Sequence, residues 1–323
     1  MPPRDATRDA PVRREDLPLL RRLWYYAQYV GPRFAASLLQ GLNEPFRREI
    51  VRLTARLTSI VDLRHAPRAM EHLAAAGYPP AECRRITRGM FEHFATAFSE
   101  ALVMRRTLSR ETMERHVEWV NMHLLDEAVA AGRGAVMVGC HQGSWELGGV
   151  CMGLRGSPIT TVARPFRNPY LDGYLNAALR TGTGQRVVHQ EGALRSLLRD
   201  IRGGRVGILM ADQNAGKGGV FVPFFGRPAS TWPTPALLAL RTGAPLLPFF
   251  TARLGPYRYA FGFHPDPPPP RTGDLEADVA AHTAWYTALF ERSIRERPEQ
   301  WLWAHRRWRS REKRPAGPPV KNA

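Results

Sequence analysis

Hydrophobic residues recur at helical spacing through the first third of the chain. Apolar positions three and four residues apart run through REIVRLTARLTSIV and RRITRGMFEHFATAFSEALVM, as expected of helices that bury one face. The segment HVEWVNMHLLDEAVAAGRG ends in another helix, which stops at a turn that contains glycine. The pattern therefore predicts a helical region over residues 18–131, preceded by a disordered segment over residues 1–17.

The pattern changes at residue 132, where short apolar runs begin to alternate with helical segments. Such runs are typical of buried strands, and their alternation with helices predicts an α/β core. We expect a central, mostly parallel mixed sheet flanked by helices over residues 132–310, and a disordered basic tail over residues 311–323. The strand segments are GAVMVGCH, SPITTVARP, QRVVHQ, RVGILMADQ, PLLPFFTARL and YRYAFGFHP.

The stretch VGCHQGSWELGG places a histidine at the carboxyl end of the first predicted core strand, where open α/β sheets bind ligands. Glu146 follows in the first turn of a predicted helix, and we expect its carboxylate to reach back to the imidazole of His141. Such a pair makes the imidazole a general base for a substrate hydroxyl. Gly143, Ser144 and Trp145 form the turn and the helix start, whose free N–H groups would stabilise an oxyanion.

Other chemistries fit this stretch less well. Cys140 precedes His141, but neighbours in a strand point to opposite faces, which disfavours a thiol nucleophile. Ser144 does not stand in a GxSxG elbow, and no third ligand stands at a spacing that suggests a metal site. A histidine packed in the core for structural reasons remains the alternative to a general base.

The formal net charge of +17 predicts a strongly basic surface, and all but three of the 46 basic residues are arginine. A balance of this size favours an anionic partner, either lipid or nucleic acid. The sequence has no zinc-finger spacing, RNP-like motif or basic heptad, so we expect no nucleic acid. Three cysteines without a CxxC pair indicate a reducing compartment.

Two segments combine aromatic residues with arginine. In residues 23–42 the run of apolar residues is interrupted by Gly31, Pro32 and Arg33, so we expect no transmembrane helix there. The segment fits a helix lying in a membrane interface, and an amphipathic helix packed on the domain is the alternative. The C-terminal block WLWAHRRWRSR suits a membrane-facing anchor, with a solvated face as the alternative.

Three further blocks extend the site motif: VARPFRNPYLDGYLNAALR, GILMADQNAGKGGVFVPFFGRPASTWPTPALLALRTGAPLLPFF and PEQWLWAHRRWRSR. In order and spacing, the blocks resemble the lipid A biosynthesis (lauroyl/myristoyl-type) acyltransferases and their phosphatidylinositol mannoside acyltransferase relatives, within the glycerolipid acyltransferase superfamily. The resemblance covers roughly residues 20–310. It implies a glycerolipid acyltransferase-like fold and transfer of a fatty acyl chain from a thioester to a lipid hydroxyl, without a metal or organic cofactor.

The resemblance also implies residue roles. His141 matches the family's catalytic base and Glu146 its carboxylate partner, while Arg164 matches an arginine assigned to the acceptor or its phosphate. A salt bridge from Arg164 to Glu146 or Asp212 is the structural alternative. Asp212 and Gln213 match the family's Asp–Gln pair and would line the acceptor site.

Asn168 and Asp172 match polar positions at the start of the next helix. For this pair we favour a structural role, with Asn168 as the N-cap and Pro169 as the first helical residue.

The expected partners follow from the same resemblance. The donor would be acyl carrier protein, which is acidic and steered by a basic face, or acyl-coenzyme A. The acceptor would be an anionic membrane lipid or glycolipid, of lipid A type first, with phosphatidylinositol mannoside or ornithine lipid as alternatives. We expect the protein at the cytoplasmic face of the inner (plasma) membrane, bound peripherally or weakly anchored. A basic membrane-binding protein without catalysis is the rival from another class.

Overall fold

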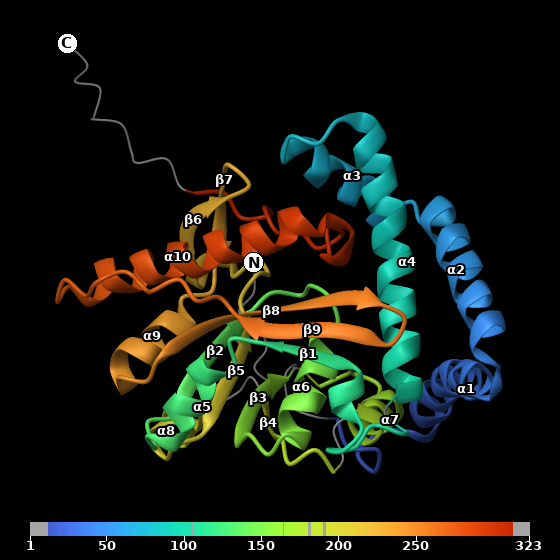
Figure 1. The fold of residues 1–323 in the computed structure, drawn as a ribbon. Coiled ribbons are helices and arrows are strands. Elements are labelled where there is room, and N and C mark those ends of the chain that lie inside the picture. Colours follow the sequence, from blue (N-terminus) through green and yellow to red (C-terminus); the bar gives the residue numbers. More distant parts are fainter. Residues whose placement is uncertain (1–11, 105, 164, 180–181, 190–191, 313–323) are drawn as a thin grey trace.

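The structure is a computed structural model that describes residues 12–312, apart from residues 105, 164, 180–181 and 190–191 (Figure 1). Four helices open the described chain. Asn43 caps the second of them, since its side chain accepts a hydrogen bond from the Phe46 N–H at 3.1 Å. The long fourth helix runs along one edge of the molecule, with the first two outside it (Figure 1). The helices are α1 (Leu19–Gly41), α2 (Glu44–Val61), α3 (His65–Ala75) and α4 (Pro80–Met104).

The core is a seven-stranded sheet in the order β1-β9-β8-β2-β5-β3-β4. All neighbouring pairs are parallel except β8 and β9, which are antiparallel. The predicted fold class, a mostly parallel mixed sheet flanked by helices, is therefore confirmed. The strands are β1 (Val117–Val120), β2 (Ala135–Gly139), β3 (Ile159–Ala163), β4 (Arg186–His189), β5 (Val206–Met210), β8 (Leu246–Gly255) and β9 (Arg258–Phe263).

The prediction of helix throughout residues 18–131 is wrong at Val117–Val120, which forms an edge strand. This segment pairs in parallel with Tyr259–Gly262 of β9. Its sequence, VEWV, has too few residues to reveal a period, and pairing with the sheet edge decides its conformation. A two-stranded hairpin, β6 (Val220–Phe224) with β7 (Arg227–Thr231), also went unpredicted.

Helices cover both faces of the sheet, and strand alternation decides which side chains they meet. Val136 and Val138 of β2 join a core cluster that also contains residues of α3, α4 and three later helices: α8 (Ala193–Arg202), α9 (Thr234–Thr242) and α10 (Leu275–Glu296). Met137, between the two valines, joins a second cluster, with residues of α5 (His123–Ala130) and α6 (Trp145–Leu154). The remaining helix of the core, α7 (Pro169–Leu179), packs against α1 and follows β3.

Candidate active site

The carboxyl ends of β2 and β5 bring a histidine and an aspartate together. The two strands pair in register, Gly139 opposite Met210, and each is followed two residues later by a polar side chain. His141 Nδ1 lies 2.7 Å from Oδ1 of Asp212, and the His141 backbone N–H donates to Oδ2 at 2.9 Å. The indole N–H of Trp301 donates to the same Oδ2 at 2.8 Å. The carboxylate is thus held by three donors.

The electrostatics of this pair favour an ionised carboxylate beside a basic imidazole. Burial by itself raises the pKa of Asp212, but the charge and hydrogen bonds of His141 and the Trp301 N–H outweigh it and lower that pKa to about 2. Burial lowers the pKa of His141, but the charge and hydrogen bond of Asp212, and then the charge of Glu146, raise it overall. An ionised carboxylate on Nδ1 keeps the proton there, so Nε2 carries the lone pair of a base.

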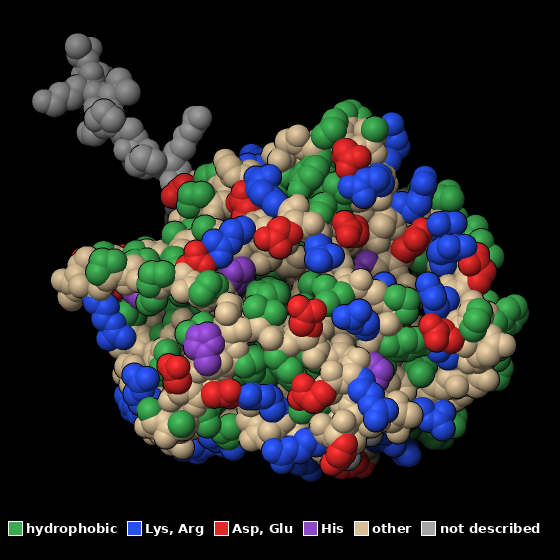
Figure 2. Space-filling view, viewed as in Figure 1, with side chains coloured by type: hydrophobic (Ala, Val, Ile, Leu, Met, Phe, Trp, Pro, Cys, Tyr) green, Lys and Arg blue, Asp and Glu red, His purple; other side chains and the backbone are tan. Residues whose placement is uncertain are grey.

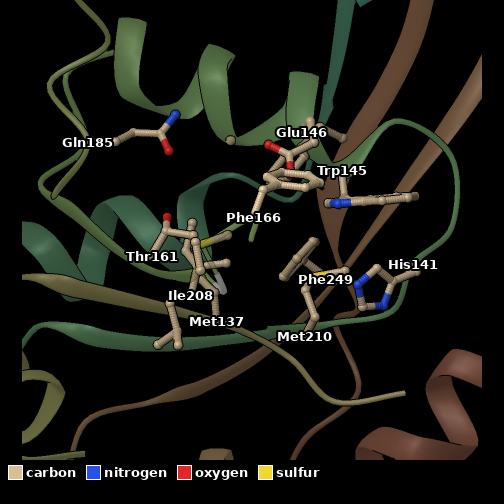
Figure 3. Close-up of a pocket in the computed structure, with 14 residues that line it drawn as sticks. Met137, His141, Trp145, Glu146, Thr161, Phe166, Gln185, Ile208, Met210 and Phe249 are labelled. Atoms are coloured by element: carbon tan, nitrogen blue, oxygen red, sulfur yellow. The ribbon is translucent and has the colours of Figure 1, made fainter. Parts of the chain in front are cut away.

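The expectation that Glu146 holds the imidazole is corrected by this geometry, because the carboxylate bonded to Nδ1 belongs to Asp212. Glu146 acts on the pKa of His141 through its charge. The ring of Trp145 packs edge-on against the imidazole, with ring centroids 4.9 Å apart. In Figure 3, Trp145 lies between Glu146 and His141, and the Glu146 side chain lies beside α6 above the pocket. Asp212 was expected at a strand end, but the sequence does not reveal which two strand ends are neighbours.

The turn after β2 is shaped by Gly143, whose φ of +63° favours glycine. A Cβ at this position would lie 2.3 Å from the Thr251 carbonyl oxygen. The Gly143 N–H donates to the Gln300 carbonyl at 3.0 Å, so this amide is already occupied. Ser144 stands at the N-cap position of α6, and its side chain makes no capping bond.

The predicted oxyanion donors therefore narrow to two amides. The N–H groups of His141, Gln142 and Gly143 all donate within the protein. Within the described residues, those of Ser144 and Trp145 donate to no protein acceptor. They sit at the start of α6, where the helix dipole favours a negative charge.

An apolar pocket of about 230 Å³ opens beside His141, between α6 and one face of the sheet (Figure 3). On the sheet side the wall includes Met137, Ile208 and Phe249, which belong to the second core cluster and so share the face that α6 covers. In Figure 3, Thr161 and Gln185 lie at the far end from His141. The lining residues include Met137, Thr161, Phe166, Gln185, Ile208, Met210, Phe249 and Phe261, with His141, Trp145 and Glu146.

Two other predicted site residues build the start of α7. Asn168 Oδ1 accepts hydrogen bonds from the backbone N–H of Tyr170 at 3.0 Å and of Leu171 at 3.3 Å. Asp172 Oδ1 accepts from the Phe166 N–H at 2.9 Å. These contacts agree with the structural role that we favoured. Asn168 Nδ2 also donates to the Tyr25 carbonyl at 2.8 Å, which ties the start of α7 to α1.

Among the remaining predicted residues, Gln213 is half-buried next to Asp212, and Arg164 lies outside the described residues. The predicted membrane anchor in the C-terminal block is wrong for two of its members, since Trp303 and Arg307 are completely buried. Arg307 donates from Nη1 to the Ser230 carbonyl at 2.6 Å and lies over the Phe224 ring. Trp301, Trp303 and Arg307 of the block are therefore part of the core, whereas Arg306 and Arg309 are exposed.

These features define a class: an α/β protein with an aspartate-held histidine at the strand ends, at the mouth of an apolar pocket. A sequence model described as "Bacterial lipid A biosynthesis acyltransferase" matches residues 14–310. The chain belongs to that family.

Individual relatives carry more specific names. A phosphatidylinositol mannoside acyltransferase from Mycobacterium tuberculosis is 32% identical over 212 residues, 62% of this chain and 64% of the relative. The lipid A biosynthesis lauroyltransferase of Escherichia coli is 30% identical over 207 residues, 64% of this chain and 65% of the relative. The match thus spans less than two thirds of each relative's own length. The crystal structure of a 1-acyl-sn-glycerophosphate acyltransferase from Thermotoga maritima superposes with a TM-score of 0.36 and 14% identity, over 80% of this chain and 98% of that one.

Proposed function

We propose that the protein is an O-acyltransferase that moves a fatty acyl chain from a thioester to a hydroxyl of a membrane lipid. The observation that carries this proposal is the His141–Asp212 pair at the mouth of an apolar pocket. A general base alone would serve many reactions, and the apolar pocket beside it favours a substrate with a hydrocarbon chain. Membership of the lipid A biosynthesis acyltransferase family supports the same reaction.

The chemistry needs few groups. The lipid hydroxyl oxygen attacks the thioester carbon while His141 Nε2 takes the hydroxyl proton. The negative charge that develops on the thioester oxygen is stabilised by the Ser144 and Trp145 N–H groups. The carbon–sulfur bond then breaks, and the proton on His141 passes to the departing thiolate. Asp212 keeps its charge throughout and stabilises the imidazolium.

The roles of the neighbouring residues follow from their places. The acyl chain would lie along Met137, Ile208 and Phe249, under α6. Glu146 stands at the pocket mouth and raises the pKa of His141 by its charge. By resemblance to the family, Arg164 would bind the acceptor or its phosphate, and Gln213 would face the acceptor.

The donor would be acyl carrier protein or acyl-coenzyme A, and the acceptor a lipid A-type glycolipid or a phosphatidylinositol mannoside, as the relatives' names suggest. No described helix is long and apolar enough to cross a bilayer. We propose that the protein works at the cytoplasmic face of the plasma membrane, bound peripherally or weakly anchored.

Exposed apolar side chains on α1 and α2 support that placement. Of the 21 large hydrophobic side chains exposed among the described residues, 14 lie between Leu19 and Leu63. Six exposed arginines lie between Leu19 and Arg64, and Figure 2 shows hydrophobic and basic side chains interspersed along the edge where α1 and α2 lie. This combination suits the headgroup region of a bilayer with anionic lipid. The arginines are Arg21, Arg22, Arg48, Arg52, Arg56 and Arg64.

The test is to incubate the purified protein with acyl thioesters of graded chain length, on acyl carrier protein and on coenzyme A, together with extracted membrane lipids. Mass spectrometry should reveal a lipid in which an acyl group replaces one hydrogen. A protein that binds vesicles but gives no acylated lipid with any donor would support the rival function of a basic membrane-binding protein.

A further inference from the structure

The third donor to Asp212 comes from a distant part of the chain. The Trp301 indole N–H donates to Oδ2 at 2.8 Å, and both side chains are almost fully buried, at 1% exposure for Trp301 and 3% for Asp212. Trp301 is not among the residues that line the pocket. The indole N–H therefore contacts the site through the Asp212 carboxylate.

The segment that carries Trp301 is itself fixed to the turn after β2. Gln142 and Trp301 form an antiparallel bridge, and the Gly143 N–H donates to the Gln300 carbonyl at 3.0 Å. The Trp301 ring packs against Phe224, with centroids 5.5 Å apart. The backbone and the ring are both held, so the direction of the indole N–H is fixed as well.

We propose that Trp301 is a positioning residue for acyl transfer, whose indole N–H fixes the Asp212 carboxylate in the orientation that turns His141 Nε2 toward the substrate hydroxyl. With Oδ2 held by the indole and by the His141 N–H, Oδ1 faces Nδ1 and the carboxylate cannot rotate about its last bond. Without the indole N–H, only the two donors of His141 itself would orient the carboxylate. This inference rests on the proposed function.

The first variant to measure is Trp301→Phe, which keeps an aromatic ring and removes the donor. We expect kcat to fall about 10- to 100-fold, as is typical when an outer partner of a catalytic ligand is lost, with KM changed less than about threefold. The donor stabilises the ionised carboxylate, so its loss makes the pair hold its proton more tightly. The acid limb of kcat/KM should then move to higher pH.

A matched control lies two residues further on. Trp303 is buried in the same aromatic cluster, with its ring centroid 4.8 Å from that of Trp301, and its indole N–H donates to the Pro298 carbonyl at 2.7 Å. Trp303→Phe also removes an indole N–H from the cluster but leaves Asp212 untouched. We expect it to lower the melting temperature about as much as the first variant, and to leave kcat and the acid limb within about twofold and a few tenths of a pH unit of the parent protein.

Other charged or titratable groups act on the pair, and they are common to both variants. Each of these groups interacts through its charge with His141 or Asp212. Because both tryptophan variants retain all of them, their effect on the pKa values cancels when the two variants are compared. They are Cys140, Glu146, His305 and Arg307.

A measurement on the unmodified protein needs neither activity nor a variant that folds. With tryptophan labelled by ¹⁵N, the indole resonance of Trp301 should shift as His141 titrates, while that of Trp303 should not. Equal behaviour of the two phenylalanine variants in kcat and in the acid limb, or a Trp301 resonance insensitive to the titration, would overturn the proposal. If the parent protein transfers no acyl group, the proposed function fails, and the titration still decides whether the indole and the pair are coupled.

Discussion

The N-terminal helices and the C-terminal segment have similar compositions and opposite environments. Both combine tryptophan with arginine, and the sequence favours a membrane role for each. On α1, Trp24 is 63% exposed, whereas Trp301 and Trp303 are buried and Trp301 donates to the Asp212 carboxylate. Aromatic and basic composition therefore does not distinguish a membrane-facing surface from a core. The two environments are distinguished by the hydrogen-bond partner of each indole N–H and each guanidinium.

The largest effect is expected at the carboxylate that the C-terminal segment holds. Asp212→Asn keeps the shape of the side chain but removes the charge that stabilises the imidazolium and fixes its tautomer. We expect kcat/KM for acyl transfer to fall about 10³- to 10⁴-fold, as in other aspartate–histidine pairs, while binding to vesicles is unchanged. Asp126→Asn is the control, because Asp126 pairs with Arg155 on the surface, and it should stay within a few-fold of the parent. Comparable losses in the two variants would contradict the assignment of Asp212.

The next largest difference is expected in stability, when a tryptophan is removed from each of the two regions. Trp303→Ala opens a cavity in the core, and we expect the free energy of unfolding to drop by about 3–5 kcal/mol. Trp24→Ala should change it by less than about 0.5 kcal/mol, because the side chain is exposed. Urea denaturation measures both. Similar values would mean that α1 packs in solution as tightly as the C-terminal segment.

Membrane binding is expected to depend on the N-terminal helices. Leu53, Leu57 and Ile60 lie three and four residues apart on α2 and are 54%, 56% and 72% exposed. Changing all three to serine should weaken binding to vesicles that contain anionic lipid by about tenfold or more, since each leucine-sized side chain contributes up to about 1.5–3 kcal/mol when fully buried. Leu194→Ser with Leu275→Ser changes exposed leucines elsewhere and serves as the control. If both sets weaken co-sedimentation equally, α2 is not the docking surface.

The smallest expected effect is in the pH dependence. The base must be unprotonated, and Asp212 raises the pKa of His141, so kcat/KM should fall about tenfold per pH unit below an acid limb that lies above 6.5. The pKa of Asp212 is lowered to about 2, so the stability that its ionised form contributes is present above about pH 4 and lost as pH falls toward 2. A pH–rate profile and unfolding at graded pH measure the two. An acid limb below 6.5 would contradict the pairing.

The strand and helix pattern of the core could be predicted from the sequence because each element has its own period. Helix α6, for example, begins and ends where WELGGVCMGL does. The edge strand Val117–Val120 could not be predicted, because four residues carry no clear period and β9, its partner, lies about 140 residues away. His141 followed from its place after a strand. Its carboxylate partner did not, because sequence order does not reveal that β5 lies beside β2.

The same limit applies to the C-terminal block. Its arginines and tryptophans suggest a surface, and only the packed structure shows that Arg307 finds the Ser230 carbonyl and the Thr231 hydroxyl in the interior. A buried guanidinium is tolerated where backbone and hydroxyl oxygens accept its hydrogen bonds. Such partners come from a hairpin that the sequence pattern did not predict.

Acyl transfer at His141 is tested most directly by comparing the parent protein with His141→Ala in a single-turnover reaction with a thioester donor that both proteins bind. The parent should form the acylated lipid. The variant should form it at least about 10³-fold more slowly, while it still binds the donor and the vesicles. Product formation by the variant at the parent's rate would contradict the proposed chemistry.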